Sequence, residues 1–324
     1  MGNIAVLCGG VGGAKLADGF QQILLPGQLH VIVNTGDDFE HRGLPICPDL
    51  DTVLYTLAGV ADAVQGWGRA DESWQVQAQW RELGLETWFQ LGDRDIALHL
   101  LRRELQSQGL RLTEIARALA RRFKVPSELL PMCDALAPTI VVTEDGEMPF
   151  QEYFVKYRCQ PAVRGFRYGV AGPCELPVEI RDLLDSPDLE AIILCPSNPY
   201  LSISPILAVP DLRYRLARAR VPVLAVSPII GGSAVKGPAA KIMRELGLTV
   251  SPLQIAREYG DFLDAILIDE SDADLLASRQ STDPQLLTAP IMMRTAQDRR
   301  ALAELCLQLL RGVIGKHKSS STPW

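Results

Sequence analysis

The chain alternates between short apolar runs rich in β-branched residues and longer segments with helical periodicity. Continuous apolar runs are typical of strands buried on both faces, and each parallel crossover needs a helix, for which the intervening segments are long enough. The pattern predicts an α/β fold: a Rossmann-like, mostly parallel sheet with helices on both faces. The expected strands are 4–8, 29–33, 139–143, 191–195, 222–226 and 265–268. The expected helices are 51–60, 93–108, 113–122, 212–218, 237–246 and 298–311.

One internal segment and one terminal segment depart from this alternation. Residues 144–185 contain Pro, Gly and aromatic residues without a helical period, which predicts a smaller, β-containing insertion. The Rossmann-like domain then consists of residues 1–143 and 186–315. Residues 316–324 are rich in serine, and we expect a disordered tail. No apolar run approaches the ~20 residues of a membrane helix, so we expect a cytoplasmic protein with no membrane partner.

Charge and cysteine usage argue against three further classes of protein. The chain has 32 Lys and Arg against 39 Asp and Glu, a net charge of −7, which argues against nucleic acid as a partner. Its seven cysteines are scattered and never spaced as C-x-x-C, so neither a disulfide framework nor a zinc site is predicted.

The first strand runs into a cluster of glycines, Gly9, Gly10, Gly12 and Gly13, followed by Lys15. Glycine lets the backbone approach a phosphate closely, and a helix N-terminus supplies N–H groups and partial positive charge. The cluster fits neither the dinucleotide fingerprint, because its third glycine is missing, nor the P-loop, because no Gly-Lys-Ser/Thr is present. We therefore expect a phosphate cradle of another kind. The alternative is a turn that only packs a helix onto a strand.

The second strand leads into an acidic stretch. Asn34 is followed by Asp37 and Asp38, and Asp49 and Asp51 come shortly after them. Mg²⁺ is usually held by one or two carboxylates with water and substrate phosphate oxygens, so these residues predict a magnesium-bridged phosphate or diphosphate. The alternative is that these carboxylates form a turn and cap the next helix.

Further polar residues follow other strands. Ser197 and Asn198 stand between two prolines after the fourth expected strand, and Ser227 follows the fifth. Because ligands of parallel sheets bind at the carboxyl ends of strands, these residues are expected to face the same crevice. Arg94, at the start of an expected helix, is a candidate phosphate clamp, with an exposed arginine as the alternative. The tryptophans at 67, 74, 80 and 88 can cover a flat ring ligand or pack in the core.

These motifs together resemble the 2-phospho-L-lactate transferase family of coenzyme F420 biosynthesis over nearly the whole chain. The matching stretches are 9–15, 34–38, 47–52, 91–95, 150–152, 196–199 and 227–231. The resemblance implies a magnesium-dependent phosphotransferase for substituted phosphate groups. It moves a 2-phospholactyl, phosphoenolpyruvyl or 3-phosphoglyceryl group from a guanosine diphospho-conjugate to the deazaflavin Fo and releases GMP. It also implies a homodimer, in line with the prevalence of twofold assemblies.

The resemblance also assigns roles to residues. Asp37, Asp49 and Asp51 are implied as Mg²⁺ ligands and acceptor-end carboxylates, and Asp51 is similar in position to a family residue that contacts Fo. Because an aspartate not bound to metal can accept the proton of the attacking hydroxyl, our own hypothesis is that Asp51 is the proton acceptor, and Arg94 is the other expected catalytic residue. The residues expected to bind substrate are Gly9, Gly10, Gly12, Gly13, Lys15, Asn34, Asp51, Gln90, Ser197, Asn198 and Ser227. Gln90 stands where some members carry a basic residue that meets Fo, and Arg42 stands where some carry histidine.

Two other functions compete with the transferase. A nucleotide- or UDP-sugar-binding regulator of the gluconeogenesis-factor type has a similar glycine-rich start, but the Pro-Asp-Leu-Asp and Gly-Asp-Arg-Asp motifs favour the transferase. An NAD-dependent enzyme is disfavoured by the missing third glycine. Within the transferase family, the sequence leaves the phospho-acid of the donor open.

Overall fold

The computed structural model describes residues 2–63, 65–169 and 174–314. Seven parallel strands form the central sheet, which confirms the predicted α/β fold. In spatial order these strands are β14 (Gln285–Thr288), β13 (Ala265–Ile268), β10 (Val223–Val226), β9 (Leu189–Leu194), β1 (Asn3–Cys8), β2 (Leu29–Val33) and β5 (Glu128–Pro131). The predicted tail, 316–324, lies outside the described residues.

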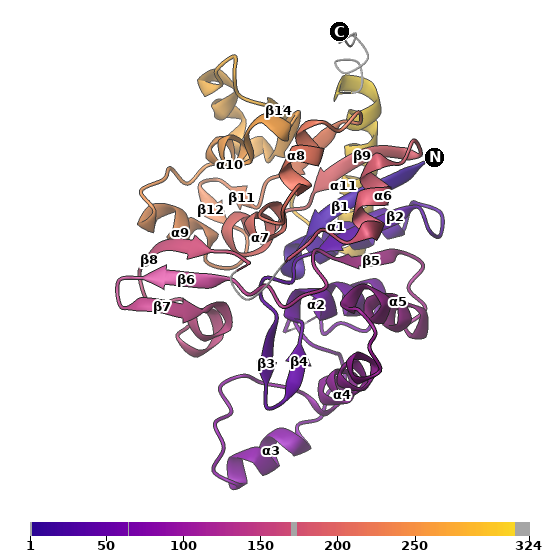
Figure 1. Cartoon of the computed structure of the whole chain (residues 1–324). Helices are drawn as coiled ribbons and strands as arrows, with labels where there is room; N and C mark the ends of the chain where they lie inside the picture. Colours follow the sequence, from indigo (N-terminus) through magenta and orange to yellow (C-terminus); the bar gives the residue numbers. More distant parts are fainter. Residues whose placement is uncertain (1, 64, 170–173, 315–324) are drawn as a thin grey trace.

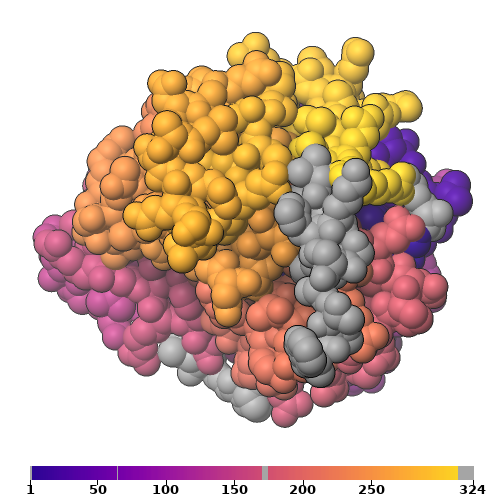
Figure 2. All heavy atoms as spheres, turned by 90° about the horizontal axis from the view of Figure 1, so that it is seen from above, coloured from indigo at the N-terminus to yellow at the C-terminus, as the bar shows by residue number. Residues whose placement is uncertain are grey.

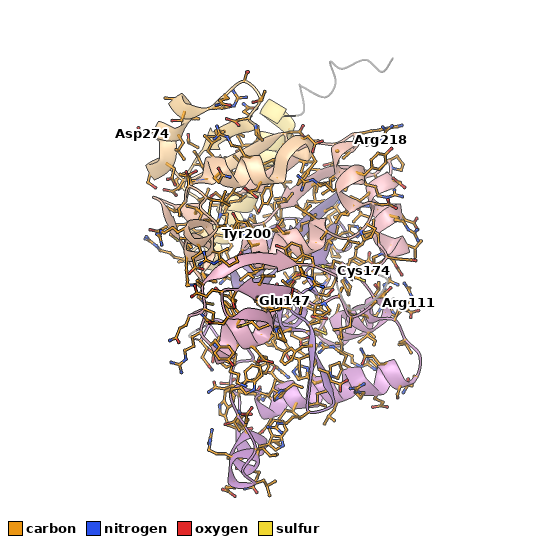
Figure 3. All side chains as sticks on the ribbon, turned by 60° about the vertical axis from the view of Figure 1, so that its left-hand side comes forward. Arg111, Glu147, Cys174, Tyr200, Arg218 and Asp274 are labelled. Carbon is orange, nitrogen blue, oxygen red and sulfur yellow. The ribbon has the colours of Figure 1, made fainter. Side chains whose placement is uncertain are left out.

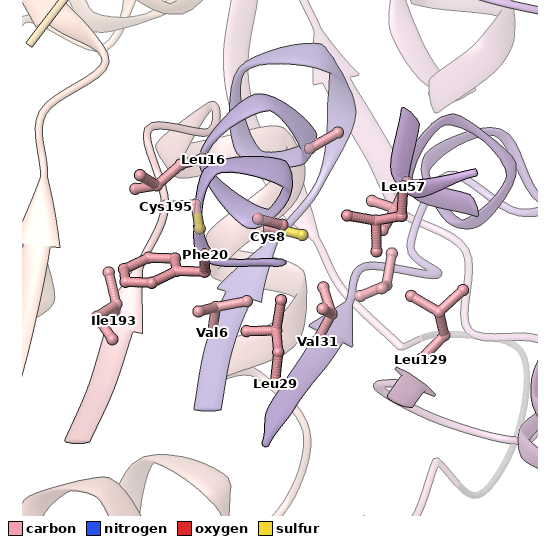
Figure 4. Packing of buried hydrophobic residues seen from close by; sticks show 14 of the residues in the cluster. Val6, Cys8, Leu16, Phe20, Leu29, Val31, Leu57, Leu129, Ile193 and Cys195 are labelled. Carbon is pink, nitrogen blue, oxygen red and sulfur yellow. The ribbon is translucent and has the colours of Figure 1, made fainter. Parts of the chain in front are cut away.

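Two apolar cores lie on opposite faces of this sheet, because successive side chains of a strand point to opposite sides. In β1, Val6 and Cys8 belong to one core, and Ala5 and Leu7 belong to the other. Figure 4 shows Val6 and neighbouring strand side chains packed beneath Leu16 and Phe20 of the first helix. Burial on both faces explains why the strands read as continuous apolar runs.

Helices cover both faces (Figure 1). One core contains residues of α1 (Gly10–Gln21), α2 (Pro48–Leu57), α4 (Asp93–Ser107), α5 (Leu112–Arg122) and α11 (Ala296–Leu309). The other contains residues of α6 (Val178–Asp185), η2 (Pro199–Ile203), α7 (Ser204–Leu207), α8 (Leu212–Ala217), α9 (Ala239–Glu245), α10 (Pro252–Tyr259) and η3 (Gly260–Phe262). Each of the six predicted helices is present, with ends within about three residues of the expected positions.

One predicted strand is assigned to the wrong sheet. Residues 139–143 form β6 (Ile140–Thr143), which pairs antiparallel with β7 (Gly146–Pro149) and β8 (Val163–Arg167) in a separate three-stranded sheet. The edge strands of the central sheet are instead β5 and β14, which the sequence analysis did not identify. Only half of β6 is buried, in alternation, as expected for a sheet with one exposed face.

The small sheet lies across the predicted domain boundary at residue 144, since β6 precedes that boundary and β7 follows it. The predicted insertion also contains α6, which packs Ile180 and Leu183 into the core beside β9. We predicted no helix in 144–185, because the segment lacks a clear helical period. That prediction is wrong for its last eight residues, which form α6. The exact division into domains stays a prediction.

The remaining elements, apart from η5, surround the carboxyl edge of the central sheet or extend from it, and η5 lies at the opposite edge. They are β3 (Phe39–His41), β4 (Leu44–Ile46), α3 (Gln75–Glu82), η1 (Glu152–Lys156), β11 (Ile229–Ile230), β12 (Ser233–Ala234), η4 (Glu270–Ser278) and η5 (Leu310–Ile314). Seen from above, α10 and the segments after it (orange to yellow) form much of the face, with the small sheet (magenta) at its edge (Figure 2). Within the described part of the chain, no helix has the length and apolarity to cross a membrane.

An ion-paired carboxylate joins the two strands at one edge of the central sheet. Glu128 lies opposite His30 in the β2–β5 register, with 3.1 Å between Oε2 and the His30 Nδ1, and Arg117 donates to its Oε1 at 2.6 Å. The His30 ring and then the Arg117 guanidinium lower the pKa of Glu128 to about 2. Since the unfolded chain takes up this proton first, the stabilisation is complete above pH ~4.5 and is lost as the pH falls toward 2.

We therefore expect Glu128→Gln to lower the free energy of unfolding by about 1 kcal/mol at pH 6, a value discounted for partial exposure of the pair. At pH 3 the loss should be smaller, because the wild-type carboxylate has begun to take up its proton. Urea denaturation of both proteins at the two pH values measures the difference. An equal loss at both would contradict the ionic origin.

Candidate functional site

A cavity of about 720 Å³ opens at the carboxyl edge of the central sheet. It is lined by residues that follow β1, β2, β9, β10 and β14, together with residues from η1 and from the loop before α4. Most of the predicted site residues line it: Gly9, Gly10, Gly12, Lys15, Asp37, Asp49, Gln90, Ser197, Asn198 and Ser227. The expected convergence of strand ends on one crevice is thus observed.

Two carboxylates face this cavity and share one buried amide. Asn34 is fully buried, and its Nδ2 donates to Asp49 Oδ2 at 2.9 Å and, more weakly, to Asp37 Oδ1 at 3.4 Å. Asp37 Oδ2 in turn accepts the backbone N–H of Asp49 at 3.1 Å. Ser202 Oγ donates to Asp49 Oδ2 at 3.3 Å. Asn34 therefore holds the two carboxylates in place and does not itself line the cavity.

The electrostatic environment disfavours the charged form of both groups. Burial raises the pKa of Asp37 well above its usual value, and the charges of Asp49 and Asp38 raise it further. Burial also raises the pKa of Asp49 to about 6, against the opposing hydrogen bond from Asn34. The partners of the two carboxylates are an amide, a hydroxyl and backbone N–H groups, none of which carries a positive charge.

Most glycines of the cluster line the cavity, and their lack of a side chain also lets other parts of the protein pack closely against them. It is not a five-residue loop, since α1 begins at Gly10. A Cβ at Gly9 would lie 2.2 Å from Asp49 Oδ2, and one at Gly12 would lie 2.4 Å from the carbonyl oxygen of Pro196. The Asp49 carboxylate also accepts the backbone N–H of Gly10. The helix N-terminus predicted to cradle a phosphate thus already holds a carboxylate.

The loop after β9 presents an unsatisfied donor. Asn198 Oδ1 caps η2 by accepting the N–H groups of Tyr200 and Leu201 at 3.0 and 3.1 Å. Its Nδ2 is buried, lacks a hydrogen-bond partner and belongs to a residue that lines the cavity. Ser197 Oγ accepts the Gly9 N–H at 3.1 Å. Because a buried donor without a partner costs free energy, Asn198 Nδ2 points to a ligand.

The hydroxyl of Ser227 has a different role. It donates to the carbonyl oxygen of Ile229 at 2.8 Å and accepts the N–H of the same residue at 3.0 Å. This serine lines the cavity, but its hydroxyl forms hydrogen bonds within the turn after β10.

Three cationic side chains line the cavity: Lys15, Arg158 and Lys236. Partial burial, then the charges of Arg299 and Lys236, lower the pKa of Lys15, whose Nζ donates to the carbonyl oxygen of Met293 at 3.3 Å. Cations crowded in this way favour an anionic ligand.

An aromatic wall completes the lining. Phe89 and Trp88 come from the loop before α4, Phe150 directly follows β7 of the small sheet, and Phe154 belongs to η1. Phe150 and Phe154 stack at 5.4 Å between ring centroids, and Trp88 meets Phe89 edge to face at 5.7 Å. Trp67 also lines the cavity, whereas Trp74 and Trp80 do not.

The other two aspartates of the acidic stretch form a separate, interior cluster. Asp51 pairs with the fully buried Arg102 of α4, and its Oδ2 lies 3.7 Å from His99 Nδ1. Arg102 also donates to the carbonyl oxygen of Pro45 at 3.0 Å. Burial raises the pKa of Asp38. The hydrogen bond from the Cys47 thiol and the charge of Arg102 act in the opposite direction and limit this rise.

Histidine in this cluster is neutral, because burial and then the charge of Arg102 lower the pKa of His99 to about 2. Asp51 does not line the cavity. Its predicted part as metal ligand and proton acceptor therefore finds no support in its position, which is that of an ion-pair partner between α2 and α4.

Two more predicted residues lie outside the cavity lining. Arg94 is exposed on α4, which is the alternative that we considered for it. Gly13 packs against Ser197 and Cys8 from within α1. The neighbouring Asp93 does not cap its own helix, because its carboxylate accepts the N–H groups of Gln75 and Val76 at the start of α3.

The sequence analysis missed the contributions of three segments. These are η1 with its flanks, the segment 65–66 before α3, and residues 291–293 after β14, whereas the glycine loop around Lys236 was a candidate phosphate cradle in the sequence and does line the cavity. Phe150 was a usable signal for η1 and its flanks, since it belongs to the matching stretch 150–152. Residues 291–293 carried none, because β14 itself was not predicted.

The carboxylates that face the cavity fit a divalent cation. They are two oxygen-donor groups with raised pKa values, and none of the hydrogen-bond partners described for them is a cation, a charge arrangement that a bound cation would relieve. Among residues 2–63, 65–169 and 174–314, no group of three or more potential metal-binding side chains occurs. Asp37 and Asp49 alone could thus supply the protein ligands, which is typical of Mg²⁺ bound together with phosphate oxygens.

A second cavity, of about 460 Å³, lies at the opposite edge of the sheet, near the start of β1 and β9. Its charged side chains are Glu190 and Arg311, which pair with each other at 3.4 Å. It therefore offers no group of catalytic residues.

Comparison with known proteins identifies the family to which the chain is similar. Residues 4–302 match the family described as 2-phospho-L-lactate transferase CofD. A phosphoenolpyruvate transferase from Streptomyces griseus is 38% identical over 316 residues, covering 96% of this chain and 99% of that protein. One from Thermobifida fusca is 39% identical, covering 94% and 98%, and a 2-phospho-L-lactate transferase from Methanosarcina mazei is 36% identical, covering 94% and 99%.

The fold has a counterpart among solved structures. A UPF0052 family protein from Bacillus halodurans superimposes with a TM-score of 0.60 over 94% of this chain and 98% of that one, at 14% identity. That likeness concerns the fold. The family match and the relatives show more: the chain belongs to the 2-phospho-L-lactate transferase family.

Proposed function

We propose that the protein transfers the phospho-acid part of a guanosine diphospho-conjugate to the deazaflavin Fo, with release of GMP and with Mg²⁺, in coenzyme F420 biosynthesis. The observation that carries this proposal is the pair Asp37 and Asp49, two carboxylates whose described hydrogen-bond partners include no cation and which face a cavity of about 720 Å³ beside the start of α1. The names of the relatives support the class of reaction.

The residues divide into those that hold a metal and those that bind the donor. Asp37 and Asp49 would hold Mg²⁺, which, when bound, neutralises phosphate charge during transfer. Lys15, Lys236 and Arg158 offset the remaining negative charge of a diphosphate. Transfer of this kind needs positioning and charge neutralisation more than covalent help, and this lining supplies both.

The acceptor fits the aromatic wall. Trp88, Phe89 and Phe154 offer ring faces to a flat heterocycle, and Gln90 lies beside them with an amide. We assign Asp51 a positioning role, since it anchors the start of α2, which carries Asp49, to Arg102.

The deciding assay incubates the protein with Fo, Mg²⁺ and each guanylated donor in turn: phospholactyl, phosphoenolpyruvyl and phosphoglyceryl. The relatives' names divide between two of these donors, so the mass of the product identifies the group moved. We expect GMP and one F420-type product. Absence of GMP with all three donors would refute the proposal.

Thermal shift separates the transferase from a regulator. The transferase should be stabilised by Fo and by GDP with Mg²⁺, because a ligand that binds only the folded state raises the melting temperature. Stabilisation by a UDP-sugar, with none by these ligands, would favour the gluconeogenesis-factor type instead. We also propose a homodimer, which light scattering after gel filtration would test.

The unsatisfied amide of Asn198 gives a sharper test of the donor site. Asn198→Asp keeps the oxygen that caps η2 but replaces the donor in the cavity by a second oxygen. We expect KM for the donor to rise about 10- to 100-fold with the melting temperature little changed. Asn198→Ala, which also removes the cap, should lower both affinity and stability. An unchanged KM in Asn198→Asp would exclude contact between this amide and the donor.

A further inference from the structure

One face of the helical segment after β7 lines the large cavity and carries a cation at its far end. The residues of this face recur at spacings of one and four positions: Phe150, Gln151, Phe154, Val155 and Arg158. Tyr153, between them in sequence, is fully buried in an apolar core. A helical segment with one face in a core and another in a cavity presents the second face to a ligand. Arg158 is the charged member of that face.

This segment is held at both ends. At its start, Gln151 is buried, and its Nε2 donates to the backbone carbonyl oxygen of Asp37 at 3.2 Å. The segment therefore begins beside one of the two candidate metal ligands. At its end, the N–H of Cys159 donates to the carbonyl oxygen of Tyr153 at 2.8 Å. The face that starts next to the candidate metal site thus reaches Arg158 through a backbone that is fixed on both sides.

The guanidinium of Arg158 is not used by the protein itself. Within residues 2–63, 65–169 and 174–314, this side chain forms no ion pair and no hydrogen bond. The arginines that follow it do have carboxylate partners, since Arg164 pairs with Glu144 at 3.3 Å and Arg167 with Glu147 at 2.7 Å. Glu147 is labelled in Figure 3, on the small sheet. Because Arg158 lines a cavity and lacks such a partner, it can bind an anion there.

The backbone at this position is strained. Arg158 has a φ of 49° and Cys159 a φ of 56°, so two consecutive residues with side chains lie in the left-handed region. That conformation is unfavourable for a residue with a Cβ, whereas glycine adopts it readily. Strain of this kind clusters at functional sites, where the surrounding structure maintains it. An arginine at a position suited to glycine therefore indicates a role in binding.

From these observations, and resting on the proposed function, we infer that Arg158 binds the carboxylate of the donor's phospho-acid and so selects conjugates that carry one. The lactate, enolpyruvate and glycerate groups all have this carboxylate close to the phosphate that is transferred. A planar guanidinium donates two parallel hydrogen bonds to a carboxylate, which an ammonium group does not. Lys15 of α1 and Lys236 after β12 remain for the diphosphate. Arg158 is thus a specificity-determining residue of the donor site.

The test compares the guanylated donor with GDP, which has the diphosphate but no carboxylate. In Arg158→Gln we expect KM for the donor to rise about 10- to 100-fold, with KM for Fo within about threefold of the wild type. Calorimetry should show a similar loss of affinity for the donor and a change of no more than about threefold for GDP with Mg²⁺. Arg158→Lys, which keeps the charge without the planar fork, should recover part of the affinity. The matched control Arg164→Gln, outside the cavity lining, should leave these values unchanged.

A second pair of variants separates binding from stability. Arg158→Gly should melt at the wild-type temperature or above it, because glycine adopts the left-handed conformation without strain. It should nevertheless lose donor affinity as Arg158→Gln does. The matched control is Lys124→Gly, since Lys124 also has a positive φ, 57°, and lies outside the cavity lining. That variant should melt in the same way and keep the wild-type KM for the donor.

Three results would overturn the inference. Unchanged affinity of Arg158→Gln for the donor would exclude contact between them. An equal loss of affinity for GDP would place Arg158 on the diphosphate, and a rise confined to KM for Fo would place it on the acceptor. Failure of the wild type to release GMP would instead refute the proposed function. In that case the calorimetric comparison of donor with GDP, which needs no turnover, would still decide the inference.

Discussion

The Asp49→Asn variant is expected to lose about three orders of magnitude in kcat and yet to melt at the wild-type temperature or above it. Asparagine keeps the shape and an oxygen that can accept from Asn34, Ser202 and the start of α1. It removes a negative charge that burial and Asp37 disfavour. The substitution therefore relieves the fold while it takes away the charge that the reaction needs.

Steady-state kinetics with the donor found active, and a melting curve with and without Mg²⁺, measure the two effects. Mg²⁺ should raise the melting temperature of the wild type and leave that of Asp49→Asn unchanged. The matched control is Asp283→Asn, because Asp283 is also buried but pairs with Arg257 at 2.8 Å, outside the cavity lining. That variant should melt lower and keep kcat within about twofold. Reduced stability of Asp49→Asn, with activity retained, would refute our assignment.

The alternation of apolar runs and helical segments predicted most of the fold, because strands buried on both faces leave a local signal. The edge strands were missed for a related reason. β5 begins with the ion-paired Glu128 and ends in proline, and β14 has only one buried residue, so neither reads as a continuous apolar run. Residues 139–143 have the right composition for a central strand, but the pairing partner of a strand is not encoded in its composition.

The sequence predicted where the candidate site lies. It did not predict which of the four aspartates face the cavity and which lie in the interior. The sequence places four aspartates close together, and the structure separates them into two pairs. Asp49 and Asp51 stand two residues apart on α2, about 200° around a helix of 3.6 residues per turn, so they point to opposite sides. Asp37 turns toward the cavity with Asp49, and Asp38 turns inward with Asp51.

What the sequence could not show is the cation that distinguishes these pairs. Arg102 lies 51 residues after Asp51, inside an expected helix where its sequence position does not mark it as the partner of that aspartate. Its complete burial depends on how α4 packs against α2 and β4, which is tertiary information. Arg102 lies beside Asp51 and Asp38, whereas the hydrogen-bond partners described for Asp37 and Asp49 carry no positive charge, and the position of Arg102 distinguishes the two pairs.

Replacing this arginine should give the largest loss of stability among the variants considered. Arg102→Met is expected to lower the free energy of unfolding by about 3–5 kcal/mol, because it leaves the charge of Asp51 buried without its partner. Urea denaturation measures the loss. Arg103→Met is the matched control, since the neighbouring Arg103 pairs with Glu40 on the exposed face of the same helix and should cost no more than about 1 kcal/mol.

A second substitution decides whether charge or packing is responsible. If the loss comes from the unpaired carboxylate, Asp51→Asn should cost less in the Arg102→Met background than in the wild type, where it breaks the ion pair. Should Arg102→Met not fold, Arg102→Lys, which keeps a charge but not the planar fork, serves in its place with an intermediate loss. Equal stability of Arg102→Met and Arg103→Met would mean that the interior pair contributes nothing. In that case Asp51 would be free for the direct part in transfer that its position now argues against.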